Sequence, residues 1–160
     1  MKVGGMVIHE EDAARINQVL SRFLAESGAT EVLLIDRGGQ LLAMDGVNRA
    51  LDTVSISALA AAAFSSTSAM AQLLGEPEFP ALFHEGVKRS IHVSTVDDEA
   101  ILMAIFDERT TVGMVRLFAR EAGKNIGIVL AESRARPKRV GEFATPLSLD
   151  ETRPNWERPR

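Results

Sequence analysis

Few residues in this chain have the type and spacing that catalysis or metal binding would need. The three histidines are His9, His84 and His92, and none has a second histidine four positions along, the spacing that places two metal ligands on one helix face. His84 and Glu85 are adjacent, so their side chains diverge unless the backbone bends. We therefore expect a capping or turn role for this pair, and solvated positions for His9 and His92.

The remaining polar residues give no stronger signal of a reaction centre. Asp36, Asp107 and Glu108 lie at the ends of predicted strands and could bind a cation, but solvated carboxylates are the better interpretation. The run Ser65–Ser68 falls within a predicted helix without a base nearby in the sequence, so it is not a nucleophile signature. The chain has no cysteine and no G-x-x-x-x-G-K-[ST] motif. We expect no catalytic residue, no metal and no cofactor.

The composition indicates a cytoplasmic globular domain. The chain has 160 residues, 46% hydrophobic and 25% charged, which suits one domain with its own core. No apolar run approaches 18 residues and the N-terminus lacks a signal-peptide pattern, so we expect no membrane insertion. The net charge is −4, but residues 134–160 hold seven Lys/Arg against four Asp/Glu, which leaves −7 on residues 1–133. An acidic body argues against a nucleic-acid partner.

The hydrophobic pattern predicts three helices and five strands. The helices are expected over residues 10–26, 54–74 and 120–133, and the strands over residues 31–37, 40–44, 86–96, 100–106 and 112–118. Gly38 and Gly39 suit a two-residue hairpin turn with positive φ angles. Two strands, 31–37 and 100–106, are apolar on both faces, so helices must cover both sides of the sheet.

These elements define the predicted fold class and the domain boundaries. We predict an α/β (α+β) domain over residues 1–133, a three-layer α-β-α sandwich of order αββαβββα. Its five-stranded, mostly antiparallel sheet extends across a homodimer. Residues 134–160 are basic and contain prolines, which predicts a C-terminal tail that is flexible or docked.

The predicted helix over residues 54–74 has no charged residue along its length. A sector about 100° wide forms a core stripe of Ile56, Leu59, Ala60, Ala63, Met70 and Leu74. The opposite side carries small residues and Gln72, where a solvated face would carry several charges. The helix is either interior to its own monomer or a partner surface. We favour a partner surface because a contiguous apolar patch is seldom left in water.

The strand over residues 86–96 alternates polar and apolar side chains and lacks proline. This is typical of an exposed edge strand, which is a template for strand addition. Pairing of this edge with its own copy about a two-fold axis would bring two central helices side by side. The sequence therefore predicts a homodimer. The residues expected at its edge are Lys88, Ser90, Ile91, His92 and Ser94.

The element order and several local motifs resemble the roadblock / dynein light chain superfamily, and within it the bacterial MglB family. The motifs are Leu34–Leu41, Leu51–Thr53, Leu73–Pro80, Phe83–Gly86 and Ile105–Leu117. They follow one another in the family's order through residues 8–132, so the resemblance covers nearly the whole predicted domain.

The resemblance implies a function as well as a fold. Members of this family are homodimers whose paired central helices bind the Ras-like GTPase MglA in its GTP state. They accelerate GTP hydrolysis without an arginine finger and help to set cell polarity and motility direction, in the cytoplasm and concentrated at a cell pole. The positions carried over as GTPase contacts are Ala61, Ala62, Ser65, Ala69 and Gln72.

Two other functions are open from the sequence. One is a scaffold of the same fold that binds a GTPase or a motor complex without stimulating hydrolysis. The other is a small-molecule sensor, although the sequence shows no convergent polar groups on its apolar elements. Arg109, in the predicted turn 107–111, is the most plausible arginine finger if the protein uses one.

Overall fold

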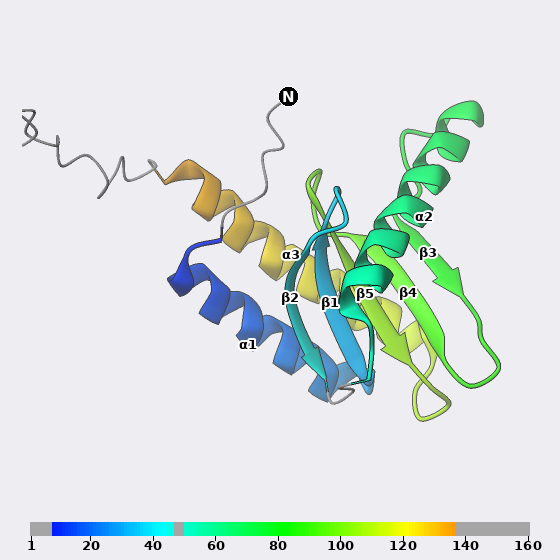
Figure 1. The fold of residues 1–160 in the computed structure, drawn as a ribbon, viewed down its shortest axis with the longest axis horizontal. Coiled ribbons are helices and arrows are strands. Elements are labelled where there is room, and N and C mark those ends of the chain that lie inside the picture. Colours follow the sequence, from blue (N-terminus) through cyan, green and yellow to red (C-terminus); the bar gives the residue numbers. More distant parts are fainter. Residues whose placement is uncertain (1–7, 47–49, 137–160) are drawn as a thin grey trace, which may run out of the picture.

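The two-sided strands and amphipathic helices assemble into three layers in the computed structural model, which describes residues 8–46 and 50–136 (Figure 1). The helices are α1 (Glu10–Ser27), α2 (Thr53–Leu73) and α3 (Val112–Ala135). The strands are β1 (Glu31–Asp36), β2 (Leu41–Gly46), β3 (Ala81–His84), β4 (Ser90–Thr95) and β5 (Ala100–Phe106). The predicted order αββαβββα and the fold class are confirmed. The predicted tail began at residue 134, but α3 continues to Ala135 and is followed by its C-cap Arg136. Residues 137–160 lie outside the described residues.

All neighbouring strands pair antiparallel, in the order β2-β1-β5-β4-β3. The β1–β2 connection is longer than the predicted two-residue turn. The backbone N–H of Asp36 donates to Gln40 O (2.9 Å), so three residues, 37–39, lie between the last paired positions. Only Gly39 in this loop has a positive φ, 92°. A Cβ on Gly39 would lie 2.9 Å from Cα of Ala58 in α2, so glycine permits both the turn and the close approach of the helix.

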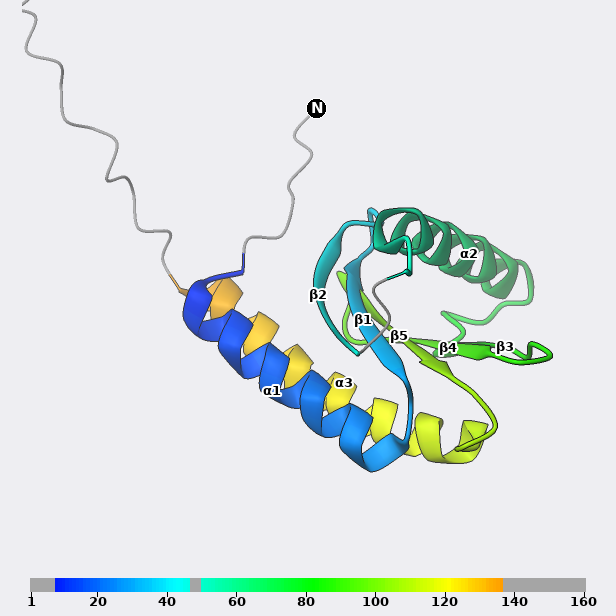
Figure 2. The ribbon, with the colours of Figure 1, turned by 60° about the horizontal axis from the view of Figure 1, so that its bottom comes forward.

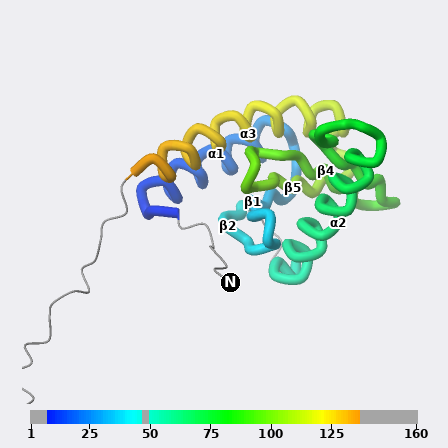
Figure 3. Tube along the Cα trace, turned by 90° about the horizontal axis from the view of Figure 1, so that it is seen from above, coloured from blue at the N-terminus to red at the C-terminus, as the bar shows by residue number. Residues whose placement is uncertain are grey.

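The core has two parts, one on each face of the sheet (Figure 2). α1 and α3 lie side by side on one face, and α2 lies alone on the other (Figures 2 and 3). Successive residues of β1 and β5 alternate between the two parts of the core, as the two-sided pattern predicts. The face toward α1 and α3 includes Val32, Leu34, Leu102, Ala104 and Phe106. The face toward α2 includes Leu33, Ile35, Ile101, Met103 and Ile105.

The predicted strand over residues 112–118 is wrong, because this segment is the first part of α3. The Thr111 hydroxyl caps the helix by accepting from the backbone N–H of Met114 (3.3 Å). Val115, Ala119 and Ala122 then recur at helical spacing and are buried. The fifth strand is instead β3, whose four residues are too few to display a clear alternation in the sequence.

Candidate partner-binding surface

α2 begins at a carboxylate cap and ends before a glycine turn. The Asp52 side chain accepts hydrogen bonds from the Ser55 hydroxyl (2.6 Å) and the Ser55 backbone N–H (3.0 Å), and these bonds lower the pKa of Asp52. Beyond the helix, Gly75 is left-handed, with φ 77°, and Pro77 follows. These signals delimit 21 residues without a charged side chain.

The side of α2 that packs on the sheet consists mainly of small residues. The buried residues are Ser57, Ala60, Ala61, Phe64, Thr67 and Ala71. The strands beneath carry large side chains, so the helix packs closely on them mainly through small ones. Phe64 is the only large side chain of α2 that is fully buried there, and half-buried Ile56 packs against the same cluster. The predicted core stripe is therefore wrong for most of its members. Leu59, Met70 and Leu74 are exposed, Ile56 and Ala63 are half-buried, and only Ala60 is buried.

The opposite side of α2 is exposed and remains apolar. We define the α2 outer face by its exposed residues Val54, Ser55, Ala58, Leu59, Ala62, Ser65, Ser66, Ala69, Met70 and Leu73. Val54 is 77% exposed, Leu59 67% and Leu73 87%. Solvated helix faces ordinarily carry charged side chains, and contiguous apolar patches usually mark an interaction site. The α2 outer face is therefore the candidate partner-binding surface.

The five predicted GTPase contacts do not all lie on this surface. Ala62, Ser65 and Ala69 belong to the α2 outer face, and Gln72 is exposed beside it. Ala61 is only 7% exposed and packs toward the sheet, which corrects its prediction as a contact. Ser65 and Gln72 also border a hollow of about 410 Å³ between α2 and the segment that contains Pro77 and Glu78.

Sequence reasoning missed the large apolar residues of the α2 outer face, Val54, Leu59, Met70 and Leu73. It assigned Leu59 and Met70 to the core because large apolar side chains are usually buried. The helix is apolar nearly all round, so its periodicity alone does not show which side meets the sheet. The absence of charges indicated that α2 has a second contact surface. The large side chains of the sheet pack against the small residues of α2, so the side with the large apolar residues faces outward.

The predicted edge strand is not at an edge. β4 pairs with β5 on one side and with β3 on the other, so Ile91 has both Ile105 and His84 as register partners. The predicted edge residues are therefore corrected as a group. Lys88 lies in the loop before β4, and Ser90, Ile91, His92 and Ser94 lie within this interior strand. The polar side of β4 faces α3, where His92 is buried and Ser90 and Ser94 are half-buried.

β3 is the strand at this edge of the sheet. Its register with β4, together with the hydrogen bond from Thr95 N–H to Pro80 O (3.2 Å), sets which backbone groups point inward. Paired and outward positions alternate in an antiparallel ladder. The backbone groups of Ala81 and Phe83 therefore point away from β4, toward the free edge. His84 is the last residue of β3 and is exposed, so the predicted turn begins after it.

His92 is buried, whereas the sequence predicted a solvated side chain. Only 1% of it is exposed, and its register partners are Phe83 in β3 and Ala104 in β5. Its side chain points to the face that α3 covers. A histidine that alternates with serines in the sequence is expected to face solvent. Its burial follows only from the pairing of β4 with β3 on one side and β5 on the other.

Two of the three carboxylates predicted at the strand ends, Asp36 and Asp107, have hydrogen-bond partners among the described residues. Asp107 holds the guanidinium of Arg109, with Arg109 Nη2 donating to Oδ2 at 2.8 Å, and this ion pair lowers the pKa of Asp107. The Asp36 side chain accepts from the backbone N–H of Gln40 (2.8 Å). Within residues 8–46 and 50–136, no group of three or more His, Asp and Glu side chains could hold a metal ion.

α2 is long and on average apolar enough to cross a membrane by length and composition alone, although serine, threonine and glutamine interrupt its apolar residues. The core helix of a folded domain passes the same test, so one such helix is weak evidence for a span. Here one side of α2 packs on the sheet through Ala60, Ala61 and Phe64.

The fold and the exposed α2 are features of a known domain. Residues 15–106, more than half of the chain, match the model of the Roadblock/LC7 domain. The chain belongs to the Roadblock/LC7 family. The match extends from within α1 to the end of β5, so it includes α2, β3 and β4 but not α3.

Solved structures of MglB proteins are similar to this Roadblock/LC7 chain. Myxococcus xanthus MglB is 36% identical, with a TM-score of 0.70, and the match covers 73% of this chain and 95% of that one. The gliding protein MglB of Thermus thermophilus is 30% identical, with a TM-score of 0.76 and coverage of 80% and 97%. An MglB with a tetrameric arrangement is 30% identical, with a TM-score of 0.77 and coverage of 81% and 97%. A comparison with curated proteins found no match.

Proposed function

We propose that this protein is a cytoplasmic, homodimeric regulator that binds a Ras-like GTPase of the MglA type in its GTP state and stimulates GTP hydrolysis. It would act in cell polarity and motility control, concentrated at a cell pole. The α2 outer face carries this proposal, because it is an exposed apolar surface along a helix of 21 residues without charge. The similarity to MglB supports a GTPase as the partner.

The proposed dimer joins two copies through β3, in place of the strand that the sequence suggested. The outward backbone groups of Ala81 and Phe83 can pair with the same strand of a second copy. A two-fold axis at this edge continues the sheet and keeps both α2 helices on one face of it. The two α2 outer faces then form one composite platform for the GTPase.

The proposed stimulation needs no arginine from this chain. The α2 outer face offers only aliphatic, Met and Ser side chains, so it acts on the GTPase by shape rather than by charge. Arg109 forms a two-pronged ion pair with Asp107, but its side chain is 71% exposed, so leaving that pair would cost little, and the Arg109→Ala variant tests whether it acts on the GTPase. The platform would hold the GTPase switch so that the GTPase's own residues reach the γ-phosphate.

Mixing the full chain with an MglA-type GTPase loaded with GTP, and recording phosphate release, tests the proposal. Wild-type protein should raise the hydrolysis rate, and Arg109→Ala should reach the same rate at saturation. Arginine fingers contribute about 10³–10⁵ in rate, so a loss of that size at saturation would make Arg109 catalytic. GTP-dependent binding without stimulation would support the scaffold function instead, and no binding would contradict both.

A further inference from the structure

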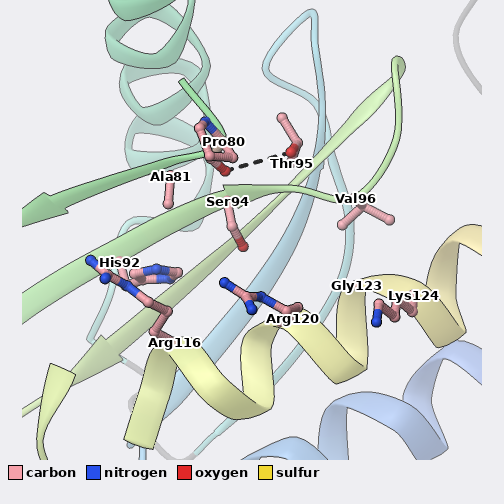
Figure 4. Close-up of a pocket in the computed structure, with 10 residues that line it drawn as sticks. All are labelled: Pro80, Ala81, His92, Ser94, Thr95, Val96, Arg116, Arg120, Gly123 and Lys124. Atoms are coloured by element: carbon pink, nitrogen blue, oxygen red, sulfur yellow. Dashed lines mark hydrogen bonds between the residues drawn. The ribbon is translucent and has the colours of Figure 1, made fainter. Parts of the chain in front are cut away.

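A second hollow lies on the sheet face opposite α2. It is a cavity of about 430 Å³ between β4 and α3, and Figure 4 shows the side chains that line it. Its floor includes His92 and Ser94 of β4, and its wall carries Arg116, Arg120 and Lys124 of α3. We call it the α3–β4 cavity.

Three cations share this wall because they recur every four residues along α3. Residues four apart lie on one helix face, about 6 Å apart along the axis. Two glycines on the same side bring α3 against the end of β4. A Cβ on Gly127 would lie 3.4 Å from Val96 O, and one on Gly123 3.6 Å from Thr95 O. The spacing and the glycines together hold the cations at the rim of the sheet.

Nothing in the described part of the chain neutralises these cations. Seven of its nine arginines form ion pairs, namely Arg15, Arg22, Arg37, Arg89, Arg109, Arg134 and Arg136. The two that do not are Arg116 and Arg120, and Lys124 has no ion pair there either. No carboxylate lines the cavity. All three residues are exposed at the mouth of the cavity and are hydrated there, but like charges on successive helix turns still repel one another, and a bound anion would relieve that repulsion.

The floor adds a buried polar group without a partner. His92 is 1% exposed, yet neither ring nitrogen has a hydrogen-bond partner among the described residues. Burial lowers the pKa of His92 and Arg116 lowers it further, so the ring is neutral near pH 7 and offers one N–H donor. Its neighbours in register, Phe83 and Ala104, bear no charge. A buried donor left unpaired is destabilising, and a ligand oxygen would satisfy it.

We propose that the α3–β4 cavity binds a small molecule that carries a diphosphate group. The planar guanidinium groups of Arg116 and Arg120 suit phosphate oxygens, and His92 and Ser94 supply neutral donors beneath them. The three cations stand on successive turns, about 6 Å apart along the axis, which suits a ligand longer than one phosphate. The volume fits a small ligand. The site supplies the convergent polar groups that the sequence lacked for a sensor function. It lies on the opposite side of the sheet from α2, so it does not use the α2 outer face, although Pro80 and Ala81 at the proposed dimer edge also line it.

Calorimetry with the full chain and sodium pyrophosphate at low salt tests this site. Wild-type protein should bind pyrophosphate more tightly than orthophosphate. Arg116→Gln and Arg120→Gln should each weaken binding by about ten- to hundredfold, as expected for a lost charge-assisted hydrogen bond. Lys88→Gln removes the same charge from the exposed loop before β4 and should leave binding unchanged. Equal losses in all three variants, or no binding by wild type at millimolar pyrophosphate, would overturn the proposal.

Two further arms identify the source of the diphosphate and test the class of ligand. Tighter binding of ADP than of pyrophosphate would assign the cavity to nucleotides, and equal binding would assign it to diphosphates in general. Tighter binding of a hexaglutamate peptide than of either would overturn the small-molecule proposal in favour of an acidic protein segment.

A change at His92 separates ligand binding from folding. His92→Leu removes an unpartnered buried polar group, so the free protein should be as stable as wild type or more stable. The same variant should weaken pyrophosphate binding by about tenfold, and His92→Gln, which keeps a donor, should weaken it less. Unchanged pyrophosphate affinity in His92→Leu would show that His92 does not contact the ligand and would overturn this assignment.

Discussion

The guanidinium of Arg37 lies over the ring of Phe64, with 5.0 Å between Cζ and the ring centroid. The same group donates from Nη2 to Glu78 Oε1 (3.1 Å) and to the carbonyl oxygen of Asp97 (3.2 Å). Arg37 directly follows β1, Phe64 is the large buried residue of α2, and Glu78 belongs to the segment after α2. One side chain therefore connects the sheet, the underside of the platform helix and the segment that leads to the β3 edge.

Arg37→Met should lower the free energy of unfolding by about 1–2 kcal/mol, because a partly buried cation–π contact and an ion pair are lost together. Urea unfolding measures this change. Arg22→Met is the matched control, since Arg22 is more exposed and its pair with Glu26 lies on the surface of α1. The control should change stability by less than about 0.5 kcal/mol. Equal effects of the two substitutions would show that the position of Arg37 over Phe64 contributes nothing.

Pairing at the β3 edge should depend on the outward backbone N–H of Ala81. Light scattering should give twice the chain mass of 17.3 kDa for wild type. Ala81→Pro removes that donor and leaves the hydrogen bonds between β3 and β4 in place, so it should give a monomer. Ala81→Ser keeps the donor and should stay dimeric. A dimeric Ala81→Pro with an unchanged circular dichroism spectrum would place the interface elsewhere.

Charges on the α2 outer face should abolish GTPase binding. Ser65→Arg combined with Ala69→Arg places two long cations where a partner would bury them without counter-charges. Both residues are exposed, so the fold and its unfolding midpoint should change little. Asn125→Arg, on the exposed side of α3, controls for the added charge. Affinity for the GTP-bound GTPase is the measurement, and unchanged affinity in the double variant would assign this face to another role.

Stability should fall below about pH 6.5 because of His92. Its pKa is lowered in the folded protein, so the unfolded chain takes up the proton first as the pH falls through its ordinary value of 6.5. The contribution of the neutral ring is therefore present above that pH and is lost as the pH falls toward the lowered folded pKa. The slope is at most about 1.4 kcal/mol per pH unit for one proton.

Urea unfolding between pH 7.5 and 5, on the order of six pH values, measures this dependence. His92→Gln should flatten the curve over that window, because the group that titrates is gone. Exposed His84 offers the control, since His84→Gln should leave the curve as it is. A wild-type curve that matches the His92→Gln curve would show that His92 titrates alike in the folded and unfolded states.

The sequence by itself determined the order of helices and strands and the helical layers on both sides of the sheet, although it placed one strand at 112–118 and missed β3. Leu33 and Leu34, like Ile101 and Leu102, are adjacent apolar residues on opposite faces of a strand, and only a sheet covered on both sides buries both. Local caps set the helix ends in the same way, as Asp52 does for α2. The absence of charged residues from α2 also indicated, from the sequence alone, that this helix has a second contact surface.

The tertiary structure decided which side of α2 that surface is. Leu59 looked like a core residue and Ala61 like a surface residue, and the large side chains on the sheet reversed the two. Strand pairing decided the rest. β3 pairs with β4, which makes β4 interior and encloses His92 beneath Arg116. Periodicity reports only that a residue alternates with its neighbours, whereas burial depends on segments far away in the chain, because they supply the atoms that exclude water.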